Sequence, residues 1–268
     1  MVVPIRAVVK SSALGCGTIG SMSPTRAERR EDVTSRILEI GRRHLAEQGA
    51  AGLSLRAVTR DLGMVSSAVY RYVANRDELL TLLLVDAYSA QADAVYHAVA
   101  TGSDEAWDER LLVAALAFRS WALREPSRYA LLYGSPVPGY AAPAEVTTEP
   151  GTRVIGLLLG LVGEGVAAGE VVDGPAPDAV AVPLSDDLAA VAAGVGLAVD
   201  PAVLARAVLL WATVVGGTSL EVFGQYGTDS FRDPEQLFAL QVRMAIGVLR
   251  GTPAGSSGRD GRRPSPQP

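Results

Sequence analysis

Two short helical segments joined by a tight link constrain this chain more than any other feature of its sequence. Residues 54–62, SLRAVTRDL, and residues 66–73, SSAVYRYV, each have the length and apolar spacing of a short helix. Between them stands Gly63-Met64-Val65, and a glycine at this point allows the left-handed backbone that ends one helix and turns the chain. This spacing predicts a helix-turn-helix, a corner made of two packed helices.

Longer helices are expected on both sides of this corner. Residues 27–47 repeat apolar side chains with helical spacing, and Gly49 predicts the end of that helix. After the corner, Asn75-Arg76-Asp77-Glu78 reads as a capping box, with Asn75 as the N-cap and Glu78 three residues later. The apolar residues of the corner can pack onto the first long helix, which predicts a compact three-helix domain over residues 24–75.

The rest of the chain also reads as helix, and no strand-like alternation recurs in it. Helices are expected at about 76–100, 103–124, 126–133, 144–168, from a cap at Ser185-Asp186-Asp187, 202–225 and 235–250, with Pro/Gly-rich loops at 134–143 and 170–183. Disorder is expected at both ends, residues 1–23 and 251–268, and Met22 is an alternative to Met1 as the initiator. We therefore predict an all-α protein with a larger helical domain over residues 76–250.

Several function classes lack the residues that they need. Cys16 and two histidines cannot build a Cys/His zinc site, and Lys10, the single lysine, leaves none for a phosphate-binding loop in the body of the chain. The longest apolar runs fall short of the ~18 residues that a membrane-spanning helix needs, and Arg6 interrupts the apolar start that a secretory leader requires. We expect no catalytic residue, no metal, no cofactor and no membrane partner, in a reducing cytoplasm.

Charge is divided unevenly along the chain. Residues 1–84 carry 12 basic and 8 acidic side chains, a net charge of +4, whereas residues 85–250 carry 9 and 20, a net charge of −11. A basic first third favours a polyanionic partner at that end. The second short helix leaves hydroxyl, guanidinium and aromatic side chains outward, which are groups that read base edges in a major groove, while Arg56 and Arg76 are placed for phosphates. On this pattern alone, a helical ligand- or protein-binding module whose corner contacts a protein partner stays open.

A characteristic set of residues lies in and around the helix-turn-helix. It consists of Ile37-Leu38, Gly49, the run SLRAV at 54–58, Leu62-Gly63, VYRY at 69–72 and NRDEL at 75–79. With these residues, positions 33–80 resemble the N-terminal DNA-binding domain of the TetR family of bacterial transcription regulators. The resemblance implies that the second short helix is the recognition helix. The predicted DNA-binding residues are Ser54, Arg56, Ser66, Ser67, Ala68, Tyr70, Arg71, Tyr72 and Arg76. Gly41, His44 and Thr59 depart from the residues usual in the family.

The body carries a second likeness. Residues 128–143 and the segment WATVVGGTSL at 211–220 resemble TetR regulators whose penultimate helix carries a Trp-His-Gly signature. Trp211 and Gly216 match this signature, but Val215 stands at the histidine position, which removes any ligand role of an imidazole there. The resemblance implies that residues 76–250 bind an effector and form a dimer.

The family resemblance also implies a mechanism and partners. A homodimer would bind a palindromic operator in double-stranded DNA, most often as a repressor, and an unknown apolar or amphipathic small molecule would release it in the bacterial cytoplasm. The candidate dimer residues are Trp211, Val215, Leu220, Leu240 and Met244, and the candidate effector residues are Trp121, Tyr133, Phe118 and Tyr129. Each of these apolar residues can instead close the core of its own subunit.

Overall fold

The protein is described by a computed structural model that covers residues 25–172, 182–194, 199–227 and 229–251. All regular structure in these residues is α-helix, which confirms the predicted all-α class. The predicted disordered segments, 1–23 and all but the first residue of 251–268, lie outside the described residues, as do Cys16 and Met22.

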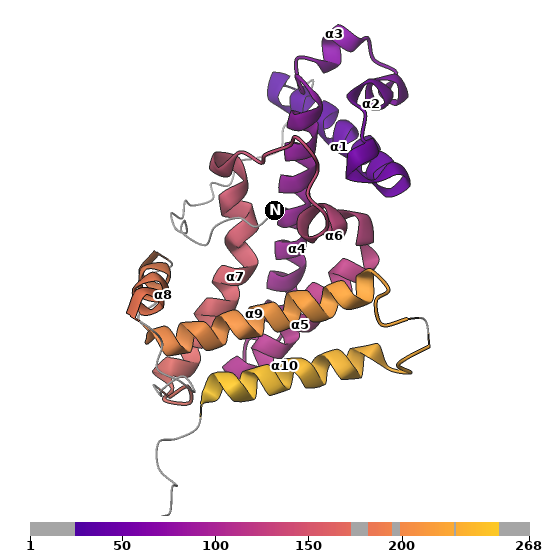
Figure 1. The fold of residues 1–268 in the computed structure, drawn as a ribbon. Coiled ribbons are helices and arrows are strands. Elements are labelled where there is room, and N and C mark those ends of the chain that lie inside the picture. Colours follow the sequence, from indigo (N-terminus) through magenta and orange to yellow (C-terminus); the bar gives the residue numbers. More distant parts are fainter. Residues whose placement is uncertain (1–24, 173–181, 195–198, 228, 252–268) are drawn as a thin grey trace, which may run out of the picture.

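The N-terminal domain contains three helices at one end of the molecule (Figure 1). They are α1 (Arg26–Gly52), α2 (Leu55–Leu62) and α3 (Ser66–Val69). Their buried apolar side chains form a core with the first turns of the next helix, through residues such as Ile37, Val58, Val69 and Leu80. The core of this domain therefore continues past residue 75, where the sequence places its boundary.

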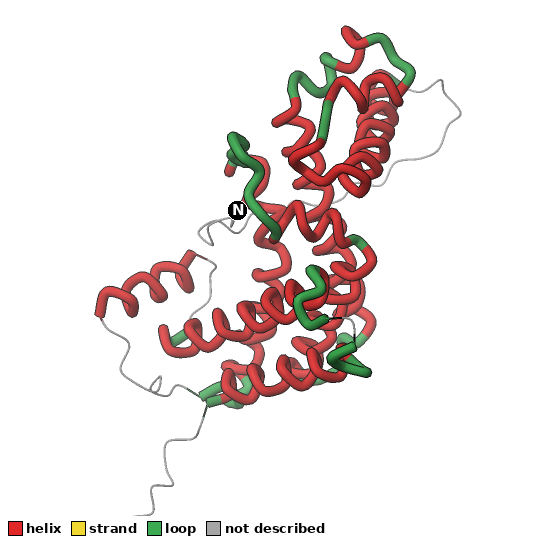
Figure 2. Tube along the Cα trace, turned by 45° about the vertical axis from the view of Figure 1, so that its right-hand side comes forward, coloured by secondary structure: helices red, strands yellow, loops and turns green. Residues whose placement is uncertain are grey.

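Seven further helices form the body. They are α4 (Arg76–Thr101), α5 (Trp107–Arg124), α6 (Pro126–Tyr133), α7 (Ala144–Ala167), α8 (Val182–Gly194), α9 (Pro201–Val222) and α10 (Pro234–Arg250). Helix α4 runs from the N-terminal domain into the body and packs on α5 and α7 (Figures 1 and 2). Helices α9 and α10 lie side by side and both contact α5, so they form one outer face of the body.

Side-chain caps fix several helix starts where the sequence predicts them. Asn75 accepts a hydrogen bond from the backbone N–H of Glu78 at 2.9 Å, and Asp200 and Asp233 cap α9 and α10 in the same way. The Glu78 carboxylate accepts from the N–H of Ala74 at 2.6 Å rather than from Asn75, so the reciprocal half of the capping box is shifted by one residue.

Other predicted ends are wrong by a few residues. Helix α5 begins at Trp107 instead of residue 103, because residues 102–105 form a turn. Helix α8 begins at Val182, so Ser185-Asp186-Asp187 lies inside it and does not cap it. Helix α9 ends at Val222, three residues early, since Gly224 adopts a φ of +67° that a helix cannot contain.

Helices α7 and α9 are long and apolar enough, by length and composition, to cross a membrane. Both pack within the body: α7 contacts α4 and α5, and α9 contacts α5, α8 and α10. Burial against these helices accounts for the apolar residues on their packed sides, while α9 also exposes Val208, Leu209 and Leu220.

Candidate nucleic-acid interface

Helices α2 and α3 form the predicted helix-turn-helix. Ser54 caps α2, and its hydroxyl accepts a hydrogen bond from the backbone N–H of Ala57 at 3.4 Å. Gly63 ends α2 in the left-handed region, with a φ of +68°, and this turn sends the chain into α3 at the tip of the molecule (Figure 1).

We call residues 66–73, the predicted recognition helix, the recognition segment. Its regular helix is shorter than predicted, but helical hydrogen bonds continue to Val73. Helix α3 ends at Val69, yet the N–H of Tyr70 donates to the carbonyl of Ser66 at 3.0 Å and that of Val73 to the carbonyl of Val69 at 3.1 Å. Val69 and Val73 are fully buried and anchor one side of this segment. The opposite side is open to solvent: Ser66, Ser67, Tyr70 and Arg71 are exposed, while Ala68 and Tyr72 are half-buried.

Arg56 and Arg76, the two predicted phosphate contacts, have different surroundings. Arg56 is exposed on α2. Arg76 instead points back to the end of α1, where its guanidinium donates to the carbonyls of Leu53 and Ala50, both at 2.9 Å, and of Ala51 at 3.1 Å. Arg76 therefore serves as a C-terminal cap of α1 in this structure, and its contact with a DNA phosphate stays a prediction.

Two of the three unusual residues of the N-terminal domain, His44 and Gly41, have structural explanations. The Nε2 atom of buried His44 lies 2.7 Å from the Asp61 carboxylate, which Arg43 also contacts at 3.0 Å, so the pair ties α1 to α2. The hydrogen bond from His44 lowers the pKa of Asp61 below its usual value. Gly41 makes room for Leu83 of α4, whose Cδ2 would lie 3.1 Å from a Cβ added at that glycine.

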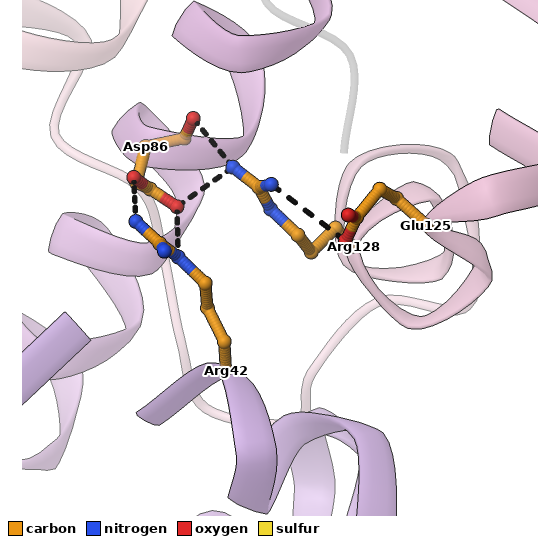
Figure 3. A network of polar contacts seen from close by, with 4 residues as sticks. All are labelled: Arg42, Asp86, Glu125 and Arg128. Carbon is orange, nitrogen blue, oxygen red and sulfur yellow. Dashed lines mark hydrogen bonds and ion pairs between the residues drawn. The ribbon is translucent and has the colours of Figure 1, made fainter. Parts of the chain in front are cut away.

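An ionic cluster joins the N-terminal domain to the body (Figure 3). The Asp86 carboxylate of α4 accepts from Nε and Nη2 of Arg42 on α1 at 2.9 and 2.6 Å. It also accepts from Nη2 of Arg128 on α6 at 2.8 Å, and the same nitrogen donates to the Asp86 carbonyl at 2.9 Å. Glu125 lies 3.7 Å from Nη1 of Arg128. We name these four residues the Asp86 cluster, and no pattern in the sequence predicted it.

Of the predicted effector residues, Phe118, Tyr129 and Trp121 are packed in the core and do not border an open cavity, whereas Tyr133 packs on Phe118 and also borders a cleft next to α1. The ring of Phe118 lies 6.1 Å from that of Tyr129 and 5.6 Å from that of Tyr133, centroid to centroid. Trp211 joins this aromatic cluster at 5.5 Å from Phe118. Phe118, Tyr129 and Trp121 are all buried, so these side chains fill the core between α5, α6 and α9.

Because of this buried cluster, we expect the folded protein to lose stability at alkaline pH. Burial raises the pKa of Tyr129 to about 12, against the opposing effect of its hydrogen bond with Ser219. A tyrosine in an unfolded chain ionises near pH 10, so between these values the unfolded state loses its proton first. The free energy of unfolding is therefore expected to fall by up to about 1.4 kcal/mol per pH unit for this residue as pH rises through that window.

Urea denaturation followed by circular dichroism between about pH 9 and pH 12 measures this slope. Tyr129→Phe removes the ionisable group and should flatten part of the slope. Equal slopes for wild type and variant would contradict the assignment.

The predicted dimer residues divide into two groups. Trp211 and Val215 pack against the core of the body, and the Val215 carbonyl accepts from the Tyr129 hydroxyl at 3.2 Å, so both residues face inward. Leu220, Leu240 and Met244 are 37%, 55% and 65% exposed. Leu220 and Met244 border a groove of about 450 Å³ between α9 and α10, together with the exposed Leu209 and Val248. Val208 and Leu240 are exposed on the same two helices outside this groove.

Comparisons with known proteins agree with this architecture. Residues 111–245 match the family described as Tetracyclin repressor-like, C-terminal domain. The HTH-type transcriptional regulators Rv1816 of Mycobacterium tuberculosis and Mb1846 of Mycobacterium bovis are each 49% identical over 226 residues, covering 84% of this chain and 95% of theirs.

Solved structures are similar over most of their length. The crystal structure of the regulatory protein SCO4313 is 33% identical with a TM-score of 0.66, covering 83% of this chain and 99% of that one. A TetR-family regulatory protein from Rhodococcus RHA1 shares the fold at 17% identity and a TM-score of 0.51, covering 81% and 96%. The chain therefore belongs to the TetR family of helix-turn-helix transcriptional regulators, and it is not an enzyme.

Proposed function

We propose that this regulator binds a palindromic operator as a homodimer, acts as a repressor in the bacterial cytoplasm and is released by a small-molecule effector. The observation that carries the DNA-binding part is the two-sided recognition segment. Val69 and Val73 are fully buried on one side, while Ser66, Ser67, Tyr70 and Arg71 are exposed on the other. Hydroxyl and guanidinium groups on such a helix can donate to base edges in the major groove.

The exposed apolar face of α9 and α10 supports the homodimer. A twofold contact through this face would bury the side chains of Leu240 and Met244 on both subunits at once. Two recognition helices would then meet half-sites about one helical turn of DNA, ~34 Å, apart or somewhat wider. Because Arg56, Arg71 and other cations would release counterions from the phosphates, affinity would fall steeply with salt.

Arg71→Ala is expected to weaken binding to DNA from upstream of the gene by about 10- to 100-fold, because an arginine that donates to a base contributes ~1–3 kcal/mol of discrimination. Fluorescence anisotropy of labelled duplexes, at a stated salt concentration, measures the dissociation constant. Sequence preference at one position of each half-site should relax in the same variant.

Arg124→Ala is the matched control, since Arg124 is also exposed but lies at the end of α5 in the body. It should bind DNA as the wild type does. We call the exposed side of the recognition segment, with Ser66, Ser67, Tyr70 and Arg71, the reading face. If Arg71→Ala binds DNA with wild-type affinity and unchanged sequence preference, the assignment of this face to DNA is wrong. Failure of the intact protein to bind any of these duplexes would favour a helix-turn-helix that contacts a protein partner.

A further inference from the structure

A cleft lies between the end of α1 and the segment formed by α6 and the loop after it. Its volume is about 730 Å³, within the range of ~300–1,000 Å³ usual for small-molecule sites. Ala46 and Gln48 of α1 stand on one wall, Ser127 and Ala130 of α6 on the other, and Gln225 after α9 also borders the cleft. The cleft thus lies between the DNA-binding domain and the body, and domain interfaces are preferred places for ligands.

The walls of the cleft are uncharged. None of its lining residues, all of them in the described ranges, is Asp, Glu, Lys, Arg or His, although charged residues make up 20% of the chain. Leu131 and Phe223 supply apolar surface, and Ser135 and Gln225 supply hydrogen-bonding groups. An ionic ligand would lose hydration here without gaining an opposite charge, whereas a neutral amphipathic ligand would find both kinds of contact.

Tyr133 on this lining stays neutral as well. Its hydroxyl donates to Oε1 of the buried Gln91 at 2.9 Å, and burial holds the pKa of Tyr133 well above its usual value. The ring therefore offers a flat, uncharged aromatic surface at physiological pH.

Polar contacts near the cleft join α1 to α4 and α6. Arg76 binds the carbonyls of Ala50 and Ala51 at the end of α1, and the Asp86 cluster joins α1 to α6. Gly134 fixes the exit of the chain from α6, because a Cβ there would lie 2.4 Å from the carbonyl oxygen of Ala130. These contacts define the relative positions of α1 and α6 on which the shape of the cleft depends.

We propose that this cleft binds a small uncharged molecule with a flat apolar body and hydrogen-bonding groups at its edge, and that occupancy moves α1 relative to α6. Since the reading face is carried on the same domain as α1, a ligand that fits one spacing of these helices better changes DNA affinity by linkage. The effect of the ligand on DNA affinity rests on the proposed function, whereas binding of the ligand in the cleft does not. At about 730 Å³ the cleft is larger than the groove of about 450 Å³ between α9 and α10.

N-phenyl-1-naphthylamine is a suitable probe, because it is uncharged, aromatic, carries one N–H donor and fluoresces more strongly in apolar surroundings. Wild-type protein without DNA should bind it saturably. Ala46→Trp and Gln225→Trp fill the cleft from different walls and should each weaken binding about tenfold or more. Ala100→Trp, at an exposed position of α4 outside the cleft, is the matched control and should bind as the wild type does.

Three outcomes would overturn the proposal. Equal probe binding in Ala46→Trp, Gln225→Trp and Ala100→Trp would place the probe elsewhere. Tighter binding of 1-anilinonaphthalene-8-sulfonate, which adds a sulfonate to the same rings, would contradict an uncharged site. Loss of self-association in Ala46→Trp and Gln225→Trp, measured by sedimentation, would make a second subunit the occupant. Circular dichroism and thermal melting confirm that each variant is folded.

DNA binding supplies a separate readout. The probe should change the affinity of wild-type protein for upstream DNA and should leave that of Ala46→Trp unaltered. If the probe binds in the cleft without changing DNA affinity, the proposed effect of the ligand on DNA binding is overturned. If the protein binds no DNA at all, the proposed function fails while the fluorescence result stands.

Discussion

Glutamate in place of both Leu240 and Met244 is expected to separate the protein into single subunits that no longer hold an operator. Leu240 and Met244 lie one helical turn apart on α10, and they are 55% and 65% exposed. In a twofold interface each substituted residue occurs twice in the same contact, so the double variant would place four carboxylates in one apolar contact. Desolvating these charges without cationic partners would cost more than the contact provides.

The loss of affinity follows from divalent binding. A single subunit can hold only one half-site, and joining two weak contacts typically gains about 10²- to 10⁴-fold in affinity. Anisotropy titrations on upstream DNA should therefore show a loss of that order, and sedimentation should show the mass of one chain. The recognition segment of the variant is unchanged, so circular dichroism and melting should report an intact fold.

Leu123→Glu is the control for this experiment. Leu123 is also an exposed leucine on a helix of the body, at 37%, but it lies on α5 outside the proposed interface. Its replacement should leave both the mass and the DNA affinity unaltered. A double variant that stays dimeric would place the subunit interface on another face.

Local signals in the sequence predicted most of the fold because helix ends depend on nearby residues. Asn75, Asp200 and Asp233 each cap a helix through a backbone N–H two or three residues away, so the cap can be recognised without tertiary information. Gly63 likewise acts locally through its positive φ. The predicted start of α5 is wrong because the turn at residues 102–105 also contains polar residues of the kind that begin helices.

It was harder to predict which face of α9 and α10 packs on the core and which meets solvent. Trp211 and Met244 both lie on helices that are apolar around much of their circumference, so periodicity cannot tell the face that meets the core from the face that meets solvent. The structure places Trp211 beside Phe118 and leaves Met244 exposed. Only the packing partners of α9 and α10 decide between the two.

Contacts between distant residues were not predictable at all. Arg76 stands next to DNA-binding elements, so its charge favoured a phosphate contact, yet its partners are carbonyls 23 to 26 residues earlier. The partners of Asp86 are 44 residues before it and 42 residues after it. No spacing rule relates such residues, because they are brought together only by the crossing of α1, α4 and α6.

Asp86→Ala is expected to lower the free energy of unfolding by about 2–3 kcal/mol. Its carboxylate is only 17% exposed and sits between Arg42 and Arg128. Removing it leaves two guanidinium groups facing each other, and Arg128 is only 11% exposed. Losing one partner of a buried pair costs ~3–5 kcal/mol, but Arg42 is 41% exposed, so solvent screening reduces that figure.

Asp93→Ala is a matched control on the same helix. Asp93 also pairs with an arginine, Arg153, at 2.7 Å, but it is 68% exposed. Both substitutions gain the same helix propensity, so the difference between them isolates the effect of burial. Urea denaturation should give a loss of no more than about 1 kcal/mol for Asp93→Ala.

A double-mutant cycle then tests whether Asp86 acts by joining the two domains. Arg42→Ala and Asp86→Ala should be coupled by about 1 kcal/mol or more, since Arg42 on α1 donates two hydrogen bonds to the Asp86 carboxylate on α4. Because α1 carries the other two helices of the DNA-binding domain, both variants should also bind upstream DNA less tightly while remaining folded. Equal stability losses in Asp86→Ala and Asp93→Ala, together with additive effects of Arg42→Ala and Asp86→Ala, would show that the cluster does not fix the domain.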